Sequence, residues 1–232
     1  MLKIKLYPCF KHWLEFNNIW LYSDPHFNDP EMIHLRKNYI SDEEQVKRIN
    51  AKIGKKDLLI CLGDVGDISF VSKLRAGYKV LIKGNHDDNG DSYYQREVIE
   101  RFSNENMTEE DKAAHASAFI NGDKETAYKI TKKYTKVEDN HLFDEVYLGP
   151  VWIAEKILLS HERIELPFVF NIYGHHHGDP INNDHLMCLC AEHINYTPVS
   201  LVTLFKNGAF AKVDSIHRRT IDKATERKLN KK

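Results

Sequence analysis

Hydrophobic residues fall into short runs separated by polar turns, and most runs in the first half of the chain predict strands. Residues 2–7 alternate as a half-buried strand does, and the run that ends at Tyr22 stops at a polar cluster. Residues 57–64 contain a short, continuously apolar run, which is typical of a strand buried on both faces, and residues 78–88 predict another buried strand that ends in polar residues. Between the strands, residues 41–54 predict a helix with Ser41 as N-cap, Glu44 as its capping partner and Gly54 as its end. Residues 67–77 predict a shorter helix.

The second half is richer in strands. Residues 143–162 predict two paired strands that turn at Gly149-Pro150, and residues 168–179 and 185–193 predict two more. Residues 197–208 predict a helix with Thr197 as N-cap, Pro198 in the first turn and Gly208 as its end, followed by a last strand at 209–214. The whole pattern predicts an α/β protein with early βαβ crossovers and a mixed sheet or two-sheet sandwich flanked by helices.

Residues 101–141 have a different composition. They are charged and rich in Ala, Lys and Glu, with helical pieces that break at Asn121-Gly122 and an N-cap at Thr108. We interpret them as a helical insertion, with a lid as one role, within a single domain of residues 1–216. Residues 217–232 form a basic C-terminal tail with seven Lys/Arg and two Asp/Glu. A frayed terminus is the preferred interpretation of the tail, and a phosphate-contacting arm is the alternative.

Composition excludes some partners. The chain has 232 residues, 42% hydrophobic and 29% charged, and its 33 Lys+Arg nearly balance 34 Asp+Glu. This balance is typical of a soluble globular protein and gives no overall charge that favours nucleic acid or a membrane. The sequence shows no membrane span and no signal peptide, so we expect a cytoplasmic protein.

The four cysteines form no CxxC pair. Most lie in apolar strand-like runs, which predicts buried thiols in a reducing compartment. Cys188 and Cys190 are two residues apart, so both side chains lie on one face of a strand; packing is the preferred role and metal binding the alternative. The others are Cys9 and Cys61.

Five apolar runs each end in a small polar cluster. In open α/β sheets a ligand binds beyond the carboxyl ends of the strands, so residues far apart in sequence can meet there. The clusters contain Asp24 and His26; Asp64 and Asp67; Asn85, His86 and Asp87; His161; and His175, His176 and His177.

These side chains offer oxygen and nitrogen donors without thiolates, which suits Mn, Fe(II), Zn or Ni. A carboxylate can bridge two cations, and two-metal hydrolytic sites hold their ions ~3.5–4 Å apart. The D-x-H pair Asp24 and His26 and the H-x-H pair His175 and His177 each place two ligands on one side of an extended segment. His176 then points away.

Taken in order, D-x-H, G-D-x-x-D (Gly63 to Asp67), G-N-H-D (Gly84 to Asp87), a strand-terminal His161 and G-H-x-H resemble the motifs of the calcineurin-like metallophosphoesterases. The resemblance covers the chain apart from the insertion and the tail, and it implies a two-sheet α/β sandwich with helices outside. It also implies two divalent metal ions, with manganese as the first choice and iron, zinc or nickel as alternatives. The implied ligands are Asp24, His26, Asp64 and His177 for one ion, and Asp64, Asn85, His161 and His175 for the other.

The resemblance further implies that His86 acts on the scissile phosphate as an acid or electrostatic clamp and that Asp67 orients it. Asp67 can also cap the helix that follows. The interpretation of Asp87 and Asp88 is loop solvation or capping, and Arg163 is a candidate phosphate contact.

The function so implied is a phosphohydrolase that uses a metal-activated hydroxide on a phosphodiester or phosphomonoester, in a nucleotide or another small phosphorylated substrate. Protein phosphatases of this fold usually carry Arg after both GDxxD and GNH, whereas Asp67 is followed by Ile68 and His86 by Asp87. Phosphodiesterase or nucleotidase activity is therefore favoured. A nuclease acting on nucleic-acid ends and a non-catalytic metal-binding scaffold of the same fold are the alternatives.

Overall fold

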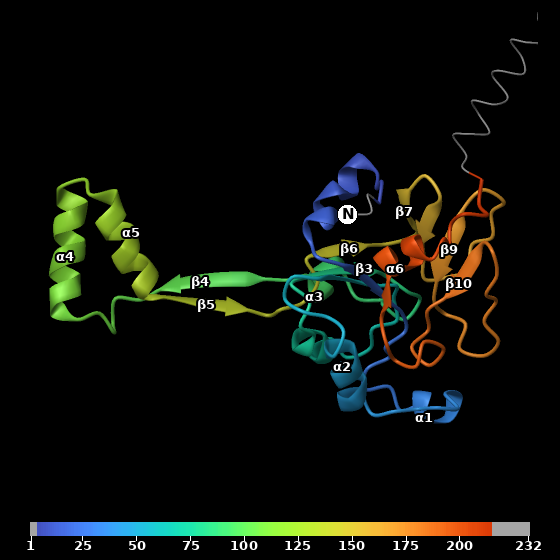
Figure 1. The fold of residues 1–232 in the computed structure, drawn as a ribbon. Helices are drawn as coiled ribbons and strands as arrows, with labels where there is room; N and C mark the ends of the chain where they lie inside the picture. Colours follow the sequence, from blue (N-terminus) through green and yellow to red (C-terminus); the bar gives the residue numbers. More distant parts are fainter. Residues whose placement is uncertain (1–3, 215–232) are drawn as a thin grey trace, which may run out of the picture. The chain divides into compact units, whose positions relative to one another are not determined.

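The computed structural model describes residues 4–214, and the predicted basic tail at 217–232 lies outside the described residues. The chain forms two compact units, one made of Met1–Gln95 and Leu142–Lys232 and the other of Arg96–His141. Each unit is described by itself below. Figure 1 shows the elements in chain order.

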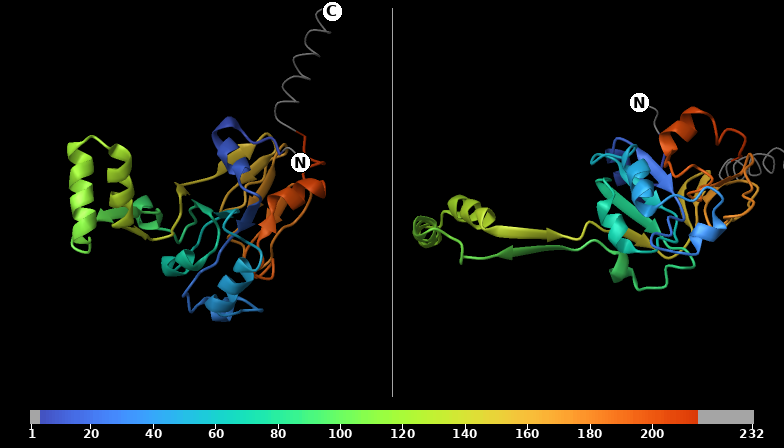
Figure 2. Two further views of the ribbon diagram at one scale, coloured as in Figure 1. Left: turned by 60° about the vertical axis from the view of Figure 1, so that its left-hand side comes forward. Right: turned by 90° about the horizontal axis from the view of Figure 1, so that it is seen from below.

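The first unit contains a five-stranded and a four-stranded sheet, seen from further sides in Figure 2. The strand order is β11-β1-β2-β3-β6 in one sheet and β10-β9-β8-β7 in the other. The strands are β1 (Ile19–Tyr22), β2 (Leu58–Cys61), β3 (Tyr78–Ile82), β6 (Glu145–Tyr147), β7 (Val151–Ala154), β8 (Ile157–Leu159), β9 (Phe170–Tyr173), β10 (Leu186–Cys188) and β11 (Val199–Ser200). The helices are η1 (Pro8–Glu15), α1 (Met32–Leu35), α2 (Asp42–Asn50), η2 (Ile68–Lys73), α3 (Asp91–Tyr94) and α6 (Leu201–Lys206).

The core lies between the two sheets. Alternate residues of the central strands, such as Leu58 and Ile60 of β2, pack in one cluster with residues of the second sheet, such as Ile157 and Ile172. The residue between them, Leu59, belongs to a second cluster on the other face, which includes side chains of α2. Both faces of β2 are buried, which explains its continuous apolar run. The predicted two-sheet α/β sandwich is confirmed.

Several predicted elements are confirmed in place. β1, β2 and β3 pair in parallel, as the predicted βαβ crossovers require. Ser41 caps α2 by accepting a hydrogen bond from the Glu44 amide, and Thr108 caps α4 (Glu109–Ile120) in the same way.

Other predictions were wrong, because periodicity does not reveal which strand is the partner. The hairpin at Gly149-Pro150 does not form: β6 pairs with β3 in one sheet and β7 with β8 in the other, so the chain changes sheet there. Residues 4–7 and 209–214 alternate but form no strand. The last helix begins after Ser200, not at Pro198, because Ser200 pairs with Trp20 of β1 and its hydroxyl caps α6.

The second unit joins a two-stranded antiparallel ribbon to a pair of helices (Figure 1). The ribbon consists of β4 (Val98–Phe102) and β5 (Thr135–Asp139), and the helices are α4 and α5 (Lys124–Lys133). The helical pieces and the break at Gly122, where φ is +69°, were predicted. The ribbon was not predicted, because charged and apolar residues alternate only weakly along its strands. The second unit begins at Arg96, five residues before the predicted start of the insertion at residue 101.

Candidate metal centre

The carboxyl ends of five strands bring the predicted site residues together. Asp24 follows β1, Asp64 follows β2, Asn85 follows β3, His161 follows β8 and His175 follows β9. The strands β1 to β3 are parallel and in register, so their ends lie side by side. A parallel bridge between Ser23 and Cys190 joins the end of β1 to the second sheet.

Asp64 lies at the middle of the site. Its Oδ2 is 3.5 Å from Nε2 of His26 and 3.2 Å from Nε2 of His161. Its Oδ1 accepts a hydrogen bond from the backbone amide of His86, at 2.9 Å. One buried carboxylate oxygen thus faces an imidazole on each side.

One group of ligand atoms surrounds His177. Its Nε2 lies 3.5 Å from Oδ1 of Asp24 and 3.3 Å from Nε2 of His26. Two imidazole nitrogens that face each other cannot both keep a lone pair there unless a proton or a cation lies between them. Asp24, His26 and His177 present three ligand atoms all within 4.8 Å of one another, as a divalent cation requires.

A second group surrounds His161. Its Nε2 lies 2.8 Å from Oδ1 of Asn85 and 3.2 Å from Nδ1 of His175, in addition to Asp64. Asp64, His161 and His175 likewise have ligand atoms within 4.8 Å of one another. Together the two groups contain all seven predicted ligands, and both contact Asp64.

The outer ring nitrogen of three of these histidines has a fixed partner. Nδ1 of His26 lies 3.0 Å from Oδ2 of Asp29, and Nδ1 of His161 lies 2.8 Å from the carbonyl oxygen of Leu62. Nδ1 of His177 lies 2.8 Å from Oε1 of Glu192. Because each partner accepts, Nδ1 carries a proton and Nε2 is the nitrogen that faces the centre, which is the usual support of metal-binding histidines.

The sequence did not predict a role for Glu192 or Asp29, and the side chain of Glu192 is the more buried of the two. Its Oε2 lies 3.1 Å from Nε of Arg36, and both side chains are almost fully buried. Arg36 also donates to the carbonyl oxygens of Asp24 and Pro25. Arg36 therefore joins the segment of the candidate ligand Asp24 to Glu192, which contacts the candidate ligand His177. The only signal for Glu192 in the sequence is an acidic residue after an apolar run.

The backbone of the site is strained. Asp24, His26, Asp64 and His175 have φ between 46° and 66°, a left-handed conformation that residues other than glycine seldom adopt. Such residues cluster at functional sites, where the surrounding structure holds them in place. Gly174 adds to the constraint, because a Cβ there would lie 1.9 Å from Oγ of Ser23 and 2.2 Å from Oδ2 of Asp24.

Asp87 caps backbone amides of the loops that carry the candidate ligands, which is the capping role of the two that were predicted for it, and not loop solvation. The side chain is buried and accepts hydrogen bonds from the amides of Asp64, Val65 and Gly84 at 2.8–3.1 Å. A carboxylate can satisfy these converging donors at the ends of two neighbouring strands, where the ladder no longer pairs them. Asp88 is exposed, as expected of a loop residue.

The remaining predicted residues lie around the rim. His86 is exposed, and the centre of its ring is 5.5 Å from that of His26. Asp67 caps η2 by accepting from the Ser69 amide, as predicted; within residues 4–214 it makes no hydrogen bond to His86, so its orienting role stays a prediction. Arg163 is half-buried.

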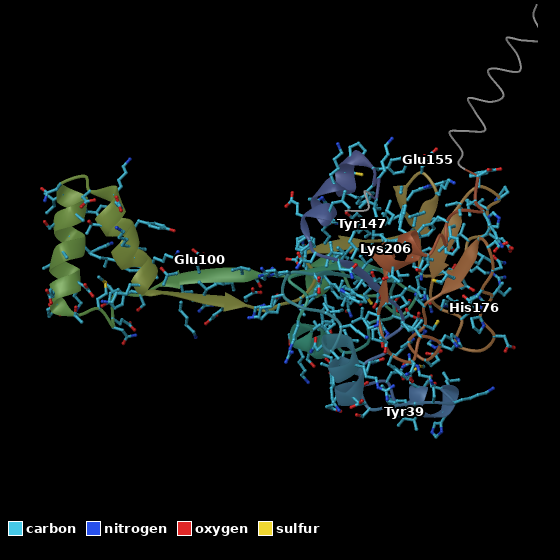
Figure 3. All side chains as sticks on the ribbon, in the orientation of Figure 1. Tyr39, Glu100, Tyr147, Glu155, His176 and Lys206 are labelled. Atoms are coloured by element: carbon cyan, nitrogen blue, oxygen red, sulfur yellow. The ribbon has the colours of Figure 1, made fainter. Side chains whose placement is uncertain are left out.

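His176, labelled in Figure 3, differs from its two neighbours in the histidine run. Its ring packs edge-on against Tyr173, and it belongs to neither group of ligand atoms. Burial lowers the pKa of His176, and the positive charge of Arg163 lowers it further.

The carboxylates and imidazoles of the site stabilise one another's charged forms. Burial disfavours a charged Asp64, but hydrogen bonds from His161 and His26 outweigh it and hold its pKa well below its usual range. Burial likewise opposes the charged form of His161, yet Asp64 raises the pKa of His161 to about 9. The site is built to bind positive charge between its carboxylates.

Comparison with known proteins agrees with this geometry. The family model described as calcineurin-like phosphoesterase matches residues 18–189, which includes every candidate ligand. A solved structure of a protein of unknown function from Aquifex aeolicus is similar at 18% identity with a TM-score of 0.47, covering 82% of this chain and 98% of that one. No curated protein matches the chain. The family match extends over most of the chain, and the chain therefore belongs to the calcineurin-like phosphoesterases.

Proposed function

We propose that the protein is a phosphohydrolase with two divalent metal ions. Asp24, His26, Asp64 and His177 would hold one ion, and Asp64, Asn85, His161 and His175 would hold the other. The observation that carries the proposal is the position of Asp64 Oδ2, 3.5 Å and 3.2 Å from imidazole nitrogens of the two groups. The all-oxygen-and-nitrogen donor set favours manganese, with iron, zinc and nickel as alternatives.

When bound, two such ions lower the pKa of a water molecule and offset charge on the phosphate oxygens. The protein's own groups supply positioning and proton transfer, which is most of what phosphoryl transfer needs. His86 is exposed beside His26, where it can donate a proton to the leaving oxygen. Arg163 is half-buried two residues after His161, and we propose that it contacts the phosphate.

The substrate we propose is a phosphodiester or a nucleotide-type phosphoester. In place of the arginines of protein phosphatases, the chain has Ile68-Ser69 after Asp67 and Asp87 after His86. The burial of Asp87 and its three backbone hydrogen bonds explain why an aspartate follows His86, because an arginine there would leave those amides without their acceptor.

We propose further that residues 1–216 form one metallophosphoesterase domain, into which Arg96–His141 is inserted. The five-stranded sheet draws β1, β2 and β3 from before this segment and β6 and β11 from after it. Insertions of this kind often carry specificity on a rigid scaffold.

The test is hydrolysis of bis(p-nitrophenyl) phosphate and of p-nitrophenyl phosphate after metal removal and Mn²⁺ addition. We expect Mn²⁺-dependent cleavage of the diester that is lost in Asp64→Asn and retained in His34→Ala, an exposed histidine of α1. Cleavage of the monoester alone would contradict a phosphodiester substrate and favour a nucleotide-type phosphomonoester. Equal activity in Asp64→Asn, or activity after full metal removal, would contradict the proposed mechanism.

A further inference from the structure

We propose that Cys188, Cys190 and His193 form a third metal site, selective for a thiophilic ion such as Zn²⁺. The sulfur atoms of Cys188 and Cys190 are 3.4 Å apart, and one ring nitrogen of His193 completes a group whose ligand atoms all lie within 4.8 Å of one another. None of the three belongs to the two groups around Asp64. Two thiolates and one imidazole are a ligand set that zinc accepts readily.

The spacing of the sulfur atoms favours a metal over a disulfide. Two sulfurs at ~2.3 Å from a tetrahedral zinc lie roughly 3.8 Å apart, so the observed pair needs to separate by only a few tenths of an ångström. A disulfide bond of ~2.05 Å would need a much larger contraction. Residues two apart in a strand also have Cα atoms about 6.6 Å apart, near the upper limit for a disulfide.

The surroundings leave the thiols available. Besides the other sulfur, Cys188 Sγ contacts the carbonyl oxygens of Gly174 and His176 at 3.8–3.9 Å, and these contacts are long. The cysteines are buried beside Tyr173 and Leu186, whereas the His193 side chain is 20% exposed and gives the ion a route from solvent. Binding would release the two thiol protons to solvent as two metal–sulfur bonds form.

This third site would brace the phosphoesterase centre. Cys190 forms the parallel bridge with Ser23, the residue before Asp24. Nε2 of His193 lies 2.9 Å from the carbonyl oxygen of His176, between His175 and His177. An ion at the third site would therefore hold together two segments that carry ligands of the other centre.

Cobalt substitution tests the proposal, because a thiolate bound to Co²⁺ gives a near-ultraviolet charge-transfer band and oxygen or nitrogen ligands do not. We expect this band in the full-length protein loaded with Co²⁺ after metal removal. It should disappear in Cys188→Ser and Cys190→Ser and weaken in His193→Ala. It should persist in Cys9→Ser, an exposed cysteine outside the group, and in Asp64→Asn, which removes only the proposed bridging ligand.

His193→Ala keeps the test valid if a cysteine variant fails to fold, because this side chain is only half-buried. A folded wild-type protein with no charge-transfer band, or a band that survives in Cys188→Ser, would overturn the proposal. So would loss of two free thiols without bound metal, which would mean a disulfide. Because the band is read without substrate, the third site can fail while phosphoesterase activity stands, and the reverse.

Discussion

Replacement of Glu192 tests whether residues that hydrogen-bond the outer ring nitrogens of the candidate metal-binding histidines determine metal affinity. Glu192 holds His177 through a 2.8 Å contact at Nδ1 and lies 3.1 Å from Nε of Arg36. Burial opposes its ionisation, but His177 and Arg36 outweigh this and lower the pKa of Glu192. In Glu192→Gln the amide oxygen can still accept from Nδ1, so the ring orientation survives while the charge is lost.

The expected magnitude follows from the two contacts. Loss of a partner behind a metal-binding histidine typically lowers metal affinity ~10–100-fold, which corresponds to about 1.4–2.7 kcal/mol. Glu192→Ala should also destabilise the metal-free protein by roughly 3–5 kcal/mol, because it leaves the buried Arg36 charge without its partner. That is a large part of the ~5–15 kcal/mol that stabilises a typical domain.

Two assays separate these effects. Titration with Mn²⁺ should show weaker binding in Glu192→Gln, with Glu43→Gln, an exposed residue of α2, as the matched control. Urea unfolding of the metal-free proteins should show the larger loss of stability in Glu192→Ala. Mn²⁺ affinity equal to wild type in both Glu192 variants would refute the idea that this carboxylate supports His177.

Three further outcomes are expected. His86→Ala should reduce kcat about 10²–10⁴-fold with Mn²⁺ affinity unchanged, and a parallel loss of Mn²⁺ would instead make His86 a ligand. The pKa of His161 is raised to about 9 in the folded metal-free protein, from ~6.5 when unfolded; its contribution to stability is full below pH ~6.5 and disappears as pH rises through about 9. Urea unfolding across this range should show that decline in wild type and a flatter profile in His161→Gln, and equal slopes would contradict the ion pair with Asp64. Gly174→Ala should lower Tm and Mn²⁺ affinity, because its Cβ would overlap Ser23 and Asp24, while Gly149→Ala, with nothing within 4 Å, should change neither.

The sequence predicted the strands that carry the ligands because those strands are buried on both faces and end abruptly in polar clusters. The apolar run at Leu58–Cys61 followed by Asp64 is the clearest case. The all-buried pattern and the motif spacing were both local, so they could be recognised without knowledge of tertiary contacts.

What the sequence did not predict depends on which segments meet. Glu192 contacts His177 because β9 and β10 are paired, and it contacts Arg36 because the segment after β1 packs against it. Nothing local distinguishes Glu192 from a surface glutamate. Asp87 looked like a loop residue because its acceptor role arises from amides of a neighbouring strand end. The alternation at residues 4–7 reflects burial of Ile4 and Leu6 against the core without a strand partner.

Within the described residues no helix is long and apolar enough to cross a membrane.

The central claim concerns the metal centre, and the most direct test is the Mn²⁺ stoichiometry of the protein. Two Mn²⁺ per chain are expected, with an electron paramagnetic resonance spectrum of magnetically coupled ions, because Asp64 Oδ2 faces both ligand groups. Thiolates are poor ligands for Mn²⁺, so the proposed third site at Cys188, Cys190 and His193 should not add to the number of Mn²⁺ ions bound per chain. One Mn²⁺ per chain, or two ions without magnetic coupling, would contradict a centre bridged by Asp64.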